Sequence, residues 1–114
     1  MIFEDIADIM AQSRSTLAWM GLDLGTKTIG VAVSDRLLSS ASPLRTVKRT
    51  KFSKDVQALL DVITNRDIGA IILGLPRNMD GSEGPRCQST RAFARNFSAF
   101  TDLPIGYWDE RLST

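Results

Sequence analysis

Histidine is absent from the 114 residues of the chain, and cysteine occurs once, at Cys87. Without histidine the chain cannot build a Ser-His-Asp or Cys-His catalytic site, or a zinc site made of histidine and cysteine. A metal bound by this protein would therefore take oxygen ligands, which suit Mg²⁺ or Mn²⁺ better than zinc or copper. The single cysteine allows no internal disulfide, which fits a reducing, cytoplasmic location.

The sequence also lacks a long apolar run and a large net charge. No run is long enough to span a membrane, and acidic residues near the N-terminus, with no early lysine or arginine, exclude a secretory signal. The 14 basic and 13 acidic residues give a net charge of +1, so overall charge indicates no partner. The length fits one domain with a single core.

Residues 19–35 hold the strongest local signal, a β-hairpin with one acid inside its first strand. Asp23 lies between two leucines, and the return strand alternates apolar and small residues. We expect Gly25 to supply a positive φ at the turn and to leave the backbone open to close approach. An acid in such an apolar strand is costly unless it has a partner, which a metal ion could supply. A turn or cap acid is the alternative interpretation.

The rest of the pattern predicts an α/β fold with five strands and two helices. After the hairpin we expect an edge strand at 43–47, a helix at 53–65 capped by Ser53, a buried strand at 70–75, a helix at about 86–100 and a strand at 105–108. With right-handed crossovers, and with strands numbered along the chain, the predicted sheet order is 3-2-1-4-5.

The first 16 residues are expected to stand apart from the domain that residues 17–114 form. Apolar residues at helical spacing predict a short amphipathic helix at 1–11, followed by a polar linker. Packing against the domain and docking to a partner are both open for this helix.

Two groups of basic residues could contact the phosphates of a polyanion, although a solvated surface is the simpler interpretation. The first group is a cluster after the edge strand, and the second lies on the second helix: Lys48, Arg49, Lys51, Lys54, Arg86, Arg91 and Arg95.

Three segments together resemble one family. They are G-L-D-L-G-T-K-T-I-G-V-A-V-S-D at 21–35, I-I-L-G-L-P-R-N-M-D-G-S-E-G-P at 71–85 and D-E-R-L-S-T at 109–114. In this order and spacing they are similar to the YqgF, or RuvX-like, family of ribonuclease-H-like proteins. Its members are described as Holliday-junction-resolvase homologues or as nucleases that mature the small-subunit ribosomal RNA precursor. The resemblance covers roughly residues 20–114.

The resemblance implies a nuclease site that uses Mg²⁺ or Mn²⁺ and acts on RNA precursors or branched DNA. The family's first acid falls on Asp23 and its second on Glu110, both as metal ligands and catalytic residues. Because Asp109 and Glu110 should point to opposite faces of a strand, only one of them can dominate as a ligand. The implied mechanism is hydrolysis with two metal ions ~3.5–4 Å apart.

Substrate contacts implied by the resemblance come from the hairpin turn and from two further residues: Gly25, Thr26, Lys27, Asn78 and Arg111. The planar guanidinium of Arg111 could clamp a phosphate, with an internal salt bridge to Asp109 as the alternative. Lys27 could equally be an exposed turn lysine.

One departure from the family pattern weakens the expectation of catalysis. Family members continue past D-E-R into a helix with another metal-binding Asp, whereas this sequence ends at Thr114. We therefore expect a ribonuclease-H-like domain without its C-terminal helix and its third carboxylate, and a poor or inactive nuclease. A non-catalytic nucleic-acid-binding domain is the main alternative. The segment D-L-G-T-K-T-I-G-V-A also resembles the phosphate loop of actin-like ATPases.

Overall fold

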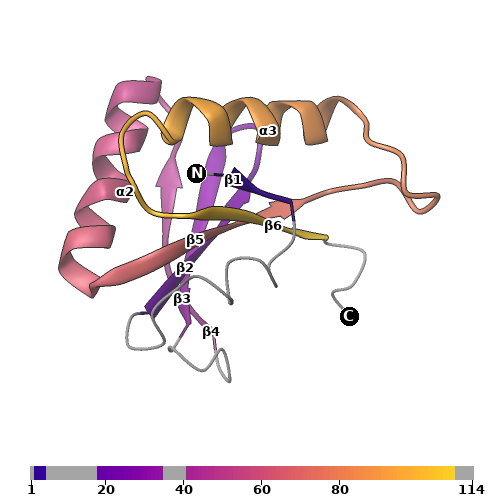
Figure 1. Cartoon of the computed structure of the whole chain (residues 1–114). Helices are drawn as coiled ribbons and strands as arrows, with labels where there is room; N and C mark the ends of the chain where they lie inside the picture. The colour runs from indigo at the N-terminus through magenta and orange to yellow at the C-terminus, as the bar shows by residue number, and fades with distance from the viewer. Residues whose placement is uncertain (1, 5–17, 35–40, 110–114) are drawn as a thin grey trace.

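The computed structural model of the chain describes residues 2–4, 18–34 and 41–109. These residues form a mixed six-stranded sheet with two helices (Figure 1). The elements in chain order are β1 (Ile2–Phe3), β2 (Ala18–Leu24), β3 (Thr28–Ser34), β4 (Ala41–Lys48), α2 (Phe52–Arg66), β5 (Ile68–Leu75), α3 (Pro85–Phe97) and β6 (Ile105–Asp109).

The strand order is β1-β6-β5-β2-β3-β4, which confirms the predicted order of the five strands β2 to β6 and adds a sixth. Strands β2, β3 and β4 are antiparallel neighbours, whereas β5 runs parallel to both β2 and β6. Strand β4 lies at the sheet edge, as its proline predicts, and Pro43 sits next to a register shift in the β3–β4 pair.

The added strand corrects the start of the predicted N-terminal helix. Residues Ile2–Phe3 pair in parallel with β6 instead of beginning a helix. This pairing satisfies backbone groups that would otherwise be open along the outer edge of β6. The remainder of the predicted helix and its linker, residues 5–16, lies outside the described residues.

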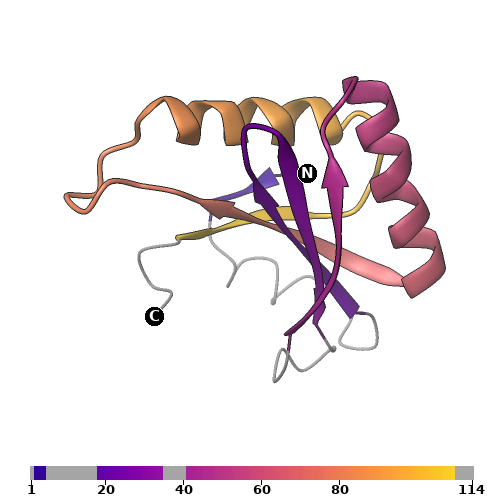
Figure 2. The same cartoon turned by 180° about the vertical axis from the view of Figure 1, so that it is seen from behind.

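Both helices cover the same face of the sheet (Figures 1 and 2). Their apolar sides and the inward residues of the strands form one core, whose largest fully buried side chains include Phe97, Met20, Leu59 and Ile71. The opposite face carries a second, smaller cluster around Trp19. In the described part of the chain, no helix is long and apolar enough to cross a membrane.

The start of α2 differs from the prediction by one residue, because the cap is not the expected serine. The helix begins at Phe52 after Lys51, and no side chain caps it. Instead, the buried carboxylate of Asp55 accepts a hydrogen bond of 3.1 Å from the backbone N–H of Thr50, just before the helix. Asp55 therefore fixes the path from β4 into α2, and Ser53 lies within the first turn.

Arg91 is the centre of a charged network inside the fold, which contradicts its predicted role as a polyanion contact. Its guanidinium donates two hydrogen bonds of 2.7 Å to the carboxylate of Glu83 and one of 2.7 Å to Glu4. It also stacks 4.8 Å from the ring centre of Tyr107. With three N–H donors and its face engaged, Arg91 ties the loop before α3 and the N-terminal strand to the body of the domain.

This network predicts a pH-dependent contribution to stability. The hydrogen bond from Arg91 lowers the pKa of Glu83 below its ordinary value of 4.5. A lowered pKa in the folded state stabilises the fold above the unfolded pKa, and the effect is lost as pH falls through the folded value. Glu83→Gln should therefore be less stable than the wild type at neutral pH, and the gap should close in acid. Urea unfolding at neutral and acidic pH measures this; a gap that is independent of pH would contradict the role of Glu83.

Candidate functional site

The face of the sheet that the helices leave uncovered carries glycine on both sides of Asp23. Backbone pairing sets Asp23 opposite Gly30 on β3. The parallel register between β2 and β5 brings it beside Gly74, which pairs with Trp108 on β6. In this row across β3, β2, β5 and β6, the residues next to Asp23 are glycines, and the nearest bulky side chain on the β5 side is Trp108.

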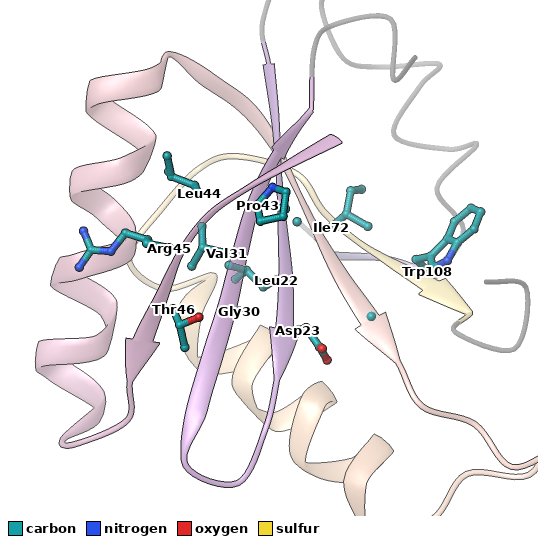
Figure 3. A pocket seen from close by; sticks show the side chains of 13 residues that line it. Leu22, Asp23, Gly30, Val31, Pro43, Leu44, Arg45, Thr46, Ile72 and Trp108 are labelled. Carbon is teal, nitrogen blue, oxygen red and sulfur yellow. The ribbon is translucent and has the colours of Figure 1, made fainter. Parts of the chain in front are cut away.

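The next row of the sheet is also made mostly of small residues. Gly21 pairs with Ala32 on one side and with Ile72 on the other. Together the two rows form an open hollow of 740 Å³, shown in Figure 3 with Asp23 on β2 and Trp108 beyond β5. Because glycine has no side chain, a ligand can approach the backbone closely here.

Asp23 is exposed in this hollow, and its carboxylate makes no ion pair or hydrogen bond with the rest of the described chain. We expected Asp23 to be buried and to need a partner, and this expectation is wrong because the side chain is exposed. Side chains alternate along β2, so Leu22 and Leu24 face the helices while Asp23 faces solvent. The carboxylate pays no burial cost and is available to an incoming cation.

The described residues place no second acid at Asp23, and they contain no cluster of three potential metal-binding side chains. Asp109 ends β6 on the helix-covered side, in alternation with exposed Trp108, and its carboxylate lies 3.8 Å from Arg77. Asp109 is therefore not among the residues that line the hollow of Asp23. Glu110 and Arg111 lie outside the described residues, so their predicted roles stay predictions.

The predicted substrate-binding turn joins β2 to β3 next to Asp23, but Gly25 serves it differently than expected. Its φ is not positive; instead, a Cβ there would lie only 3.1 Å from the backbone oxygen of Thr28. The Gly25 N–H donates a 2.8 Å hydrogen bond to that same oxygen and closes the hairpin. Thr26 and Lys27 are both exposed at the tip. A side chain at Gly25 would therefore crowd the backbone oxygen of Thr28.

Asn78 is not brought to the hollow. It lies in the loop between β5 and α3, which projects from the body of the domain (Figure 1). Its side-chain amide donates a 3.0 Å hydrogen bond to the hydroxyl of Ser82. The backbone oxygen of Asn78 accepts a hydrogen bond from the backbone N–H of Gly81. Gly81 has φ of 90°, which only glycine adopts readily. In this structure Asn78 shapes the loop tip.

Sequence reasoning missed the glycine floor of the hollow and the two arginines that lie at the hairpin turn. The floor has a readable signal, since Gly21 and Gly30 occupy positions where the strand pattern calls for a side chain on Asp23's face. Arg49 and Arg86 had been seen only as members of basic groups. Cys87 is no candidate nucleophile, because burial raises the pKa of its thiol.

Comparison with known proteins identifies the lineage. A family described as "RuvX: Holliday junction resolvase" matches residues 17–114. The chain belongs to this family. A relative from Roseobacter denitrificans, named "Putative pre-16S rRNA nuclease", is 65% identical over the whole chain and 71% of its own length. A second with the same name, from Ruegeria sp. strain TM1040, is 63% identical over the whole chain and 73% of its length.

Solved structures share the fold of this RuvX-family chain at low sequence identity. Thermus thermophilus RuvC in complex with a Holliday junction substrate has a TM-score of 0.57 and 14% identity, over 83% of this chain and 66% of that one. The large terminase nuclease of phage G20c has a TM-score of 0.54 and 13% identity, over 91% of this chain and 47% of that one. Identities this low establish the fold alone.

The hollow of the RuvX-family chain predicts that a small and a large substitution at Gly30 differ in their effect on Asp23. A Cβ at Gly30 would lie 3.6 Å from the Cβ of Asp23, an ordinary contact, so Gly30→Ala should fold and keep its stability within about 1 kcal/mol. Gly30→Leu should fill the hollow and shield the carboxylate. Amidation of Asp23 by a carbodiimide, followed by mass spectrometry, should be several-fold slower in the leucine variant only. Equal rates in all three proteins would contradict the described hollow.

Proposed function

We propose that this chain is a metal-dependent nuclease, with Asp23 in its active site, that hydrolyses phosphodiester bonds in nucleic acid. The observation that carries the proposal is the exposed carboxylate of Asp23 on a glycine-lined hollow, near the end of the central strand of a RuvX-family chain. In open α/β sheets, ligands bind beyond the carboxyl ends of the strands.

The donor chemistry at this place fits a hard divalent cation such as Mg²⁺ or Mn²⁺. The hollow offers a carboxylate oxygen and neither imidazole nor thiolate, and open space surrounds it. Asp23 would hold the metal together with Glu110, since Asp109 is placed on the other face of β6. A metal held there supplies Lewis-acid stabilisation of charge on a phosphoryl oxygen.

The residues of the hairpin turn would position the substrate. Thr26 and Lys27 are exposed beside the hollow, so their hydroxyl and ammonium groups can bind phosphate oxygens. The names of the relatives favour a pre-16S ribosomal RNA substrate, and the name of the matched family favours branched DNA. We give precedence to the RNA precursor, because the relatives with that name are more than 60% identical to this chain. Such a substrate implies a cytoplasmic location.

A non-catalytic nucleic-acid-binding domain is the second candidate. It is favoured by one observation: within the described residues, Asp23 is the only carboxylate on the hollow. A single acid leaves two divalent charges poorly balanced, whereas binding of a phosphate backbone needs no metal.

Replacing Asp23 by Asn tests the nuclease directly. The side chain keeps its size and is exposed, so the fold should survive. Mg²⁺- or Mn²⁺-dependent cleavage should fall by at least about 100-fold, because even an outer-shell partner of a metal ligand is worth about 10- to 100-fold. End-labelled RNA carrying a precursor 5′ extension and a four-way DNA junction are the two substrates. The pair also decides between RNA and DNA.

Asp61→Asn is the matched control, because Asp61 is an exposed acid on α2 that accepts a hydrogen bond from Gln57. It should cleave like the wild type. Equal cleavage by the Asp23 and Asp61 variants would refute the metal assignment. Wild-type binding of nucleic acid without any metal-dependent cleavage would establish the second candidate instead.

A further inference from the structure

A second pocket lies behind the hairpin turn, on the side of the sheet that the helices cover. Its volume is 510 Å³, and it is bounded by the end of β2, the turn, the segment after β4 and the first turn of α3. All of these elements meet at the sheet edge where β2 ends, so this pocket and the hollow of Asp23 lie on either side of the same edge.

Two arginines from distant parts of the chain converge on this pocket. Arg49 donates a 2.7 Å hydrogen bond to the backbone oxygen of Gly25, and Arg86 donates one of 3.4 Å to the backbone oxygen of Leu24. Adjacent carbonyl groups thus hold the two guanidinium groups at the pocket wall. Each guanidinium carries five N–H donors, and one is accounted for in each case.

Neither arginine forms an ion pair with a carboxylate in the described part of the chain. This separates them from Arg91, whose charge is balanced by two glutamates. The acid closest to Arg49 along the described chain, Asp55, is buried and accepts a hydrogen bond from Thr50. Two like charges held at one pocket without a counter-charge repel each other, and a bound anion would relieve this repulsion.

The remaining polar groups of the pocket suit an anion with several oxygens. The hydroxyl groups of Thr26, Thr50 and Ser89 line it, and none donates a hydrogen bond to another described residue. The N-terminal end of α3, which begins at Pro85, adds a favourable dipole. Guanidinium forks and hydroxyl donors are the groups that bind phosphate oxygens.

We propose that this pocket is a phosphate subsite that binds a backbone phosphodiester of the nucleic acid, next to the one that reaches Asp23. The identity of the ligand rests on the proposed function. The Cα atoms of Asp23 and Gly25 are roughly 7 Å apart on an extended chain, and the hollow and the pocket lie on either side of this backbone. One nucleic-acid strand that passes over the end of β2 can therefore place phosphates on both sides. Arg49 and Arg86 bind the strand and set its direction, and neither takes part in bond cleavage.

Binding of a labelled single-stranded RNA to the full chain tests the proposal, in EDTA so that no cleavage occurs. Across a series of KCl concentrations, Arg86→Gln should weaken binding about tenfold and make the slope of log affinity against log salt about 0.7 less steep. Arg66→Gln removes the same charge from the last turn of α2, at the opposite end of the sheet, and should bind like the wild type. Equal effects of both variants would overturn the proposal.

A second measurement uses the wild type and does not depend on how the variants fold. Inorganic phosphate, with chloride as the reference, should produce saturable NMR shifts at the amides of Thr26 and Arg86. Absence of these shifts would overturn the subsite. ATP distinguishes the other source of phosphate: if it binds this pocket more tightly than the RNA does, the pocket is a nucleotide site and the proposal is wrong.

The outcome can be separated from that of the proposed function. No metal-dependent cleavage by the wild type, together with an intact Arg86 effect on binding, would reject the nuclease and keep the subsite. Metal-dependent cleavage by the wild type, with no effect of Arg86→Gln on binding, would keep the nuclease and reject the subsite.

Discussion

The two-residue alternation of side chains along β2 is the constraint on which the rest of the site depends. Leu22 and Leu24 must face the helices to fill the core, and this forces Asp23 onto the uncovered face. The central position of β2, between β3 and β5, then surrounds the carboxylate with sheet on both sides. A register slip of one residue would bury the charge and expose the leucines, so the core itself fixes where the acid points.

The glycines of the uncovered face leave open space around the carboxylate that this alternation places there. In most sheets both faces are filled by side chains, yet here Gly30 and Gly74 flank Asp23 and leave backbone at the surface. The apolar cluster around Trp19 shows that the same face is packed farther along the strands. The hollow is therefore a local feature near the end of β2, and it leaves the carboxylate of Asp23 open to a ligand.

The arginines divide into structural and available charges, and their partners decide which is which. Arg91 hydrogen-bonds to Glu83 and Glu4 and stacks on the Tyr107 ring, and it anchors the loop that leads into α3. Arg49 and Arg86 hydrogen-bond only to backbone oxygens among the described residues, so their charge is still available to a ligand. A count of basic residues cannot make this distinction, because it depends on where the acids lie in space.

The sequence by itself determined the five main strands and their order, both helices to within a few residues, the family, and Asp23 as the acid of interest. Those features follow from local periodicity and short motifs. The tertiary structure alone decided the added strand β1, the face of Asp109, the glycine floor and the pairing of the arginines. The reason is sequence distance: Arg49 meets Gly25 across 24 positions, Arg86 meets Leu24 across 62, and Arg91 meets Glu4 across 87. No local pattern encodes such contacts, because strand register and crossover geometry create them.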